Sequence, residues 1–117
     1  MIAAAAGAKI FVATQPVDFR RGADSLVALV RETLDLDPFA GTIFIFRSKR
    51  ADRLKIVAWD GTGLVLLWKR LEHGAFRWPP ISDGVMRLTA SQLAALVDGM
   101  DWSRLQVRDV ARPAATS

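Results

Sequence analysis

Apolar residues are grouped along this chain in two ways, as short continuous or alternating runs and as repeats at three- and four-residue spacing. The runs are rich in β-branched and aromatic residues and predict strands. The strand segments are Lys9–Thr14, Thr42–Phe46, Leu54–Trp59 and Leu64–Leu71. The helical repeats occur between the first two runs and after the last one. Together they indicate an α+β fold, a single domain with a largely antiparallel sheet of about four to five strands and two helices.

The first helical repeat comprises Leu26, Val27, Val30 and Leu34, with charged residues between them. This spacing is typical of an amphipathic helix that turns one side to a core. The helix should end in the segment 35–38, because the residue before a proline avoids helical backbone angles.

The second helix carries its own start and stop signals. Thr89 with Gln92 three residues later forms a capping box, and Leu88 and Leu93 stand where a hydrophobic staple closes the cap. Gly99 is a typical residue just beyond a helix end. The apolar side of this helix is expected to dock on the sheet.

The last two strand segments, Leu54–Trp59 and Leu64–Leu71, should form an antiparallel hairpin. The segment 60–63 between them has the sequence Asp-Gly-Thr-Gly, which is a strong turn signal. Strand side chains alternate between faces, so Arg53, Lys55, Val57 and Trp59 should share one face. Cations would then gather at the start of this strand, and aromatic residues near the turn.

The chain has 117 residues, of which 51% are hydrophobic, and it has no cysteine. This composition supports one core without disulfides, thiolate metal sites or a thiol nucleophile. The domain is expected over residues 1–108 and a disordered tail over residues 109–117. No apolar run approaches the roughly 20 residues of a membrane span, and the start of the chain lacks the basic residues of a signal peptide. We therefore expect a cytoplasmic protein.

Positive charge is concentrated between residues 47 and 77. This segment has eight basic and three acidic residues, a net charge of +5, whereas the rest of the chain has eight basic and nine acidic residues. A local basic patch with interleaved aromatic residues is typical of a surface that meets a polyanion. Solvent-facing cations also keep a sheet edge soluble, which is the plainer alternative. The candidate nucleic-acid-binding residues are Arg47, Lys49, Arg50, Arg53, Lys55, Lys69, Arg70 and Arg77.

Three aromatic residues of the same segment, Trp68, Phe76 and Trp78, are candidates for docking a protein partner or a second copy of the chain. Stacking of aromatic residues on unpaired bases is the weaker interpretation, because a tryptophan in a strand is usually buried.

Catalytic groupings are sparse. His73 is the only histidine and precedes a glycine in an expected turn. Asp18, Asp52 and Asp60 could surround Mg²⁺ in a nuclease, but each also fits a turn or a local charge balance. The residues favour a protein without catalytic residues, metal or cofactor, and leave a metal-dependent nuclease as a minor alternative.

Several short motifs, in their order and spacing, resemble one known family. They are Pro16-Val17-Asp18-Phe19-Arg20-Arg21-Gly22, Leu36-Asp37-Pro38-Phe39, Phe44-Ile45-Phe46-Arg47, Asp52-Arg53-Leu54-Lys55, Trp59-Asp60-Gly61-Thr62-Gly63, Trp68-Lys69-Arg70-Leu71-Glu72, Phe76-Arg77-Trp78-Pro79 and Leu88-Thr89. The resemblance is to TnpB, the accessory protein encoded by the second open reading frame of insertion-sequence-66 elements. It covers the chain from about Lys9 to Trp102.

The resemblance implies an accessory factor for transposition of a bacterial insertion sequence, which binds DNA, the element's transposase, or both. Cutting and joining of DNA belong to the separate transposase in that family, so no catalytic residue is carried over. Ala58, Leu64 and Ala75 depart from the aromatic or basic residues expected at their positions. These departures weaken base stacking as a role and leave the cations in place.

Overall fold

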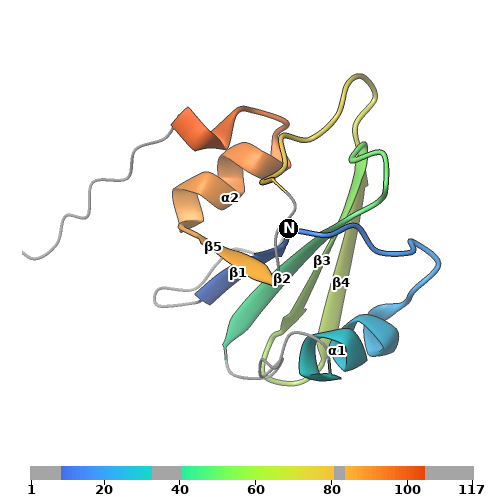
Figure 1. Cartoon of the computed structure of the whole chain (residues 1–117). Coiled ribbons are helices and arrows are strands. Elements are labelled where there is room, and N and C mark those ends of the chain that lie inside the picture. Colours follow the sequence, from blue (N-terminus) through green and yellow to red (C-terminus); the bar gives the residue numbers. More distant parts are fainter. Residues whose placement is uncertain (1–8, 33–40, 81–83, 105–117) are drawn as a thin grey trace, which may run out of the picture.

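A computed structural model describes residues 9–32, 41–80 and 84–104 of the chain. Within these residues, five strands form one sheet in the order β4-β3-β2-β1-β5, accompanied by two α-helices and a short 3-10 helix (Figure 1). The elements in chain order are β1 (Lys9–Ala13), α1 (Ala23–Glu32), β2 (Thr42–Arg47), β3 (Arg53–Trp59), β4 (Leu64–Arg70), β5 (Val85–Leu88), α2 (Ala90–Val97) and η1 (Trp102–Arg104). The α+β class, the mostly antiparallel sheet and the two helices are confirmed.

The sheet combines an antiparallel meander with one parallel pair. β2, β3 and β4 follow one another antiparallel, whereas β1 runs parallel to β2 and antiparallel to β5. Parallel neighbours require a crossover connection, and the chain between β1 and β2 includes α1. The sequence pattern did not predict β5. This strand has four residues, of which Met86 and Arg87 are exposed, so it shows no alternation of its own.

Both faces of the sheet are covered, each by a different helix. Side chains alternate along β2, so Ile43 and Ile45 pack with α2, while Phe44 and Phe46 pack with α1. Figure 1 shows α1 across the lower part of β3 and β4, and α2 on the other side of the molecule beside β5. The central strand β2 is thus buried on both faces.

The predicted ends of α2 are confirmed. The Thr89 hydroxyl accepts the Gln92 amide at 3.1 Å, and the Gln92 side chain accepts the Thr89 amide at 2.9 Å. Leu88 and Leu93 are buried together in the core under α2. After the helix, Gly99 adopts a φ of +76°, a backbone region that glycine tolerates best.

Other predictions on the chain fall outside the described residues. These include the end of the first helix at residues 35–38, its last apolar residue Leu34, and the tail at residues 109–117. Among the described residues, no helix combines the length and hydropathy needed to cross a membrane.

Candidate nucleic-acid interface

The turn between β2 and β3 holds two exposed cations, Lys49 and Arg50. The Ser48 hydroxyl donates to the Asp52 carboxylate at 3.3 Å, and the Ala51 amide donates to the Ser48 carbonyl at 3.0 Å. Ala51 takes a φ of +60°, an uncommon conformation for a residue with a Cβ. These local bonds hold the turn in place, and both of its cations remain exposed.

Immediately beyond this turn, Arg53 and Arg70 lie directly opposite each other on β3 and β4. The Leu71 amide donates to the Asp52 carbonyl at 2.9 Å, so the next pair along, Arg53–Arg70, is the non-hydrogen-bonded type in which side chains are closest. The Nε atom of Arg53 is buried and has no hydrogen-bond partner among the described residues. Like charges in this position are destabilising.

Lys55 does not belong to the exposed cations, and its assignment to a nucleic-acid surface requires correction. It is only 7% exposed, and its Nζ donates to the carbonyls of Phe19 and Arg21, both at 2.7 Å. The ammonium also lies 4.7 Å from the centre of the Phe19 ring. Its charge is thus satisfied by backbone oxygens and an aromatic face, and it anchors the loop before α1 to the sheet.

This anchoring brings two further arginines, Arg20 and Arg21, to the same side of β3, and the charge pattern of the sequence did not predict this. Arg20 forms a 2.6 Å ion pair with Asp18, whose pKa is lowered well below its usual range by the hydrogen bonds from Arg20. Arg21 is exposed, and its guanidinium donates to the Ser25 hydroxyl at 3.1 Å. Both arginines lie outside the segment 47–77. They reach this side of β3 through the contact of their loop with Lys55, which is far away in the sequence.

Lys69 and Arg47 lie on the opposite face and already have partners. The Lys69 Nζ donates to the Val97 carbonyl in the last turn of α2, where a cation is favourable. Arg47 donates to the carbonyls of Ser48 and Lys49, and its guanidinium lies 6.0 Å from the Trp78 ring centre. Burial lowers the pKa of Arg47 from its ordinary value.

The three aromatic candidates are distributed very differently. Trp68 is 53% exposed on the edge strand β4, whereas Phe76 is 3% exposed and belongs to the core, so its assignment to an exposed docking surface is wrong. Trp78 is half-buried and donates its Nε1 proton to the Ala13 carbonyl at 2.9 Å. Phe76 is buried because its segment folds back on the β2–β3 turn, where its amide donates to the Ala51 carbonyl at 2.7 Å.

That same fold-back carries Arg77, which is exposed, to the end of the sheet that holds the β2–β3 turn. Five cations therefore lie at this end, from two connecting segments and the ends of two strands. None of them has an ion-pair partner recorded among the described residues. We call this set the basic surface; it consists of Lys49, Arg50, Arg53, Arg70 and Arg77.

The three aspartates considered for catalysis accept hydrogen bonds from residues of their own turns. Asp60 accepts the amides of Thr62 and Gly63 at 3.0 and 2.9 Å, which lowers its pKa. Asp18 and Asp52 accept hydrogen bonds from Arg20 and Ser48. Among the described residues, no three histidine or carboxylate side chains gather as a metal site. His73 is exposed beside an open hollow of about 620 Å³ between the segment 71–78 and the end of α2.

The model of the family described as IS66 Orf2-like protein, TnpB of IS66 elements, matches residues 8–107. The chain belongs to this family. It is therefore an accessory protein associated with an insertion sequence, as the motifs had indicated.

Two curated relatives come from Sinorhizobium fredii (strain NBRC 101917 / NGR234). Uncharacterized protein y4jC is 50% identical over 113 residues and covers 97% of both chains. Uncharacterized protein y4hO is 36% identical over 106 residues, or 91% of this chain and 92% of that protein. No solved structure matches the chain.

Proposed function

We propose that this IS66 Orf2-like protein is a non-enzymatic factor that assists transposition by binding DNA through the basic surface. The observation that supports the proposal most directly is the collection of unpaired cations at one end of the sheet. Phosphates supply most of the attraction between a protein and DNA, and each contact releases a counterion. A rigid sheet end that presents five such cations can hold a DNA backbone in a fixed register.

The transposase of the same element is the second expected partner. A specific observation favours a docking role: Trp68 and Leu66 are exposed next to each other on one face of β4. Exposed apolar side chains of this kind often contribute to protein interfaces. In that case the protein would join the transposase without itself touching DNA.

Salt dependence distinguishes the two functions. If all five cations of the basic surface contact duplex phosphates, log K should fall with log salt at a slope near −4.5. Raising salt from about 50 to about 200 mM should then weaken binding roughly 500-fold. Replacing Lys49, Arg50 and Arg53 together by Gln should flatten the slope by about 2.7. Fluorescence anisotropy with labelled element-end DNA measures both quantities.

Lys9→Gln is the matched control. Lys9 is exposed but pairs with Thr42 at the start of β2, at the opposite end of the sheet from the β2–β3 turn. Its replacement should leave the slope unchanged. If the triple variant binds DNA with the wild-type affinity and slope, DNA binding by the basic surface is contradicted. Loss of transposase binding in a Trp68→Ala variant would then favour the docking role.

A further inference from the structure

We propose that Arg53, Arg70 and Trp68 form a site for one unpaired nucleotide of single-stranded DNA. The two guanidiniums would hold its phosphate, and the indole of Trp68 would stack on its base. The proposal rests on the DNA-binding function proposed above and specifies which form of DNA this part of the surface takes.

The three side chains lie on one face of the hairpin formed by β3 and β4. Arg53 pairs with Arg70, and Lys55 pairs with Trp68 two residues further along each strand, on the same face. Successive side chains on the same face of a strand are about 7 Å apart. A phosphate on the arginine pair therefore leaves the attached base beside Trp68.

The arginine pair is suited to binding an anion. Two cations face each other across the strands, and neither has a carboxylate or hydrogen-bond partner recorded among the described residues. Arg20 shows the contrast, because it lies nearby and is neutralised by Asp18. An opposed pair of this kind is unfavourable in the free protein, and a phosphate bound between the guanidiniums removes the repulsion.

Trp68 differs from the other tryptophans in having an exposed ring. The Nε1 protons of Trp78 and Trp102 donate to the carbonyls of Ala13 and Arg77, and both rings are at least half-buried. Trp68 is 53% exposed on the edge strand. An exposed aromatic ring beside cations is the usual platform for stacking an unpaired base.

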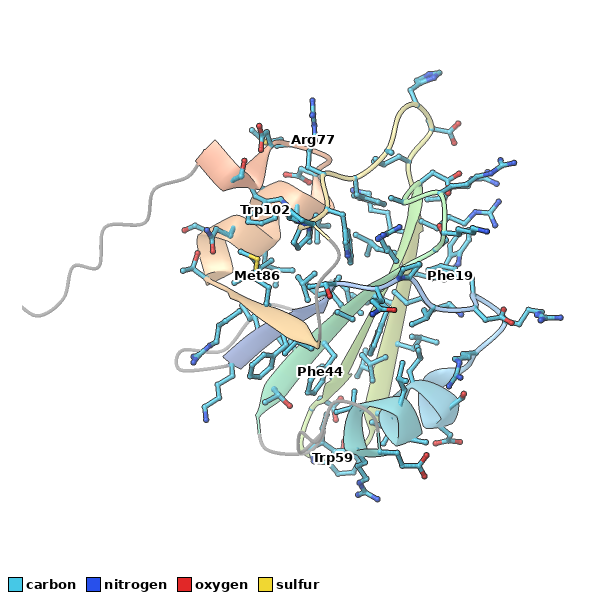
Figure 2. The ribbon with its side chains drawn as sticks, in the orientation of Figure 1. Phe19, Phe44, Trp59, Arg77, Met86 and Trp102 are labelled. Carbon is cyan, nitrogen blue, oxygen red and sulfur yellow. The ribbon has the colours of Figure 1, made fainter. Side chains whose placement is uncertain are left out.

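The loop before α1 borders this site on the side of β3. Lys55 fixes the loop through the carbonyls of Phe19 and Arg21, and the exposed guanidinium of Arg21 adds a further cation there. Figure 2 shows Phe19 toward the end of the hairpin opposite to Trp59.

Because duplex bases are stacked on each other, only a single strand can place a base face on Trp68.

The decisive measurement compares single-stranded and duplex DNA. The probe is a labelled mixed-sequence oligodeoxynucleotide of about 20 nucleotides, used alone and annealed to its complement. Trp68→Ala should weaken binding of the single strand about 5- to 150-fold and leave duplex binding within about twofold. Trp68→Phe should retain part of the affinity, because phenylalanine still stacks.

Leu66→Ala is the matched control, since Leu66 is exposed on the same face of β4 but offers no ring. It should bind the single strand as the wild type does. If Leu66→Ala and Trp68→Ala both weaken self-association or transposase binding and leave the single strand unaffected, the face is a protein interface and the nucleotide site is wrong.

The arginine pair has its own test. Replacing Arg53 and Arg70 by Gln should flatten the salt slope for the single strand by about 0.7 to 1.4, depending on whether they share a phosphate. The stability of the DNA-free protein should stay equal or rise, because a repulsion is removed. An unchanged slope, or a loss of stability, would overturn the site.

These results also separate this inference from the general function. Duplex binding with a steep salt slope, combined with no effect of Trp68→Ala on either form of DNA, would overturn the nucleotide site and leave the proposed DNA binding intact. Absence of binding to both forms would overturn both proposals.

Discussion

The two ends of the hairpin formed by β3 and β4 contain the same kind of cross-strand pair. They differ in the exposure of its side chains, which are covered at one end and exposed at the other. At the turn, Trp59 and Leu64 are half-buried, and Leu64 packs with the core under α1. At the open end, Arg53 faces Arg70 and the neighbouring Trp68 is exposed. The two pairs share one face of the same strands, so the difference lies in what covers them.

The turn end satisfies its polar groups locally. The Asp60 carboxylate accepts two backbone amides, and the Asp60 amide donates to the Gly63 carbonyl at 3.1 Å. The open end leaves cations and an aromatic ring without partners among the described residues. Surfaces that are left unsatisfied in this way lower stability and are usually retained for binding. The hairpin therefore has one end that is covered and locally satisfied, and one end whose cations and aromatic ring are exposed.

The largest expected effect is a loss of folding stability on truncation of a core residue at the covered end. Leu26 of α1 is fully buried over this part of the sheet, so Leu26→Ala should lower the free energy of unfolding by about 2–5 kcal/mol. Arg70→Gln at the open end should change it by no more than about 0.5 kcal/mol. Urea unfolding followed by tryptophan fluorescence measures both. Equal losses from the two variants would contradict the division of the hairpin.

Lys55 lies between the two ends and is buried, although Trp68 opposite it is exposed. Lys55→Met leaves the Phe19 and Arg21 carbonyls without their donor, so the free energy of unfolding should fall by about 1–3 kcal/mol. Lys49→Met, at an exposed position, should cost less than about 0.5 kcal/mol. The salt slope of DNA binding should be unchanged by Lys55→Met, and a flattening of about 0.9 would return Lys55 to the phosphate-contacting residues.

The smallest effect concerns pH at the turn. Because the folded pKa of Asp60 lies below its ordinary value of 3.8, the stability that its carboxylate provides is complete above that value. It is lost as the pH falls through the folded pKa. The difference in unfolding free energy between wild type and Asp60→Ala should therefore shrink in acid. Asp60→Asn keeps an acceptor oxygen without titrating, and a difference that grows in acid would contradict this role.

Much of the fold could be predicted from the sequence. Three features could be predicted because each depends on interactions within a few residues. They are the capping box at Thr89, the helix end at Gly99 and the turn at Asp60. β5 could not be predicted because its four residues carry no periodicity, and it exists as a strand by pairing with β1. The parallel pairing of β1 with β2 likewise depends on the path of the whole connection.

For the candidate site, the concentration of positive charge in one segment and the family resemblance of the motifs follow from the sequence alone. Which of those side chains are exposed depends on how the chain folds. Lys55 is buried by carbonyls 34 and 36 residues away, and Phe76 by a fold-back onto the β2–β3 turn. Trp68 is exposed because β4 lies at the edge of the sheet. Exposure depends on which distant segments cover a residue, and no local pattern encodes that.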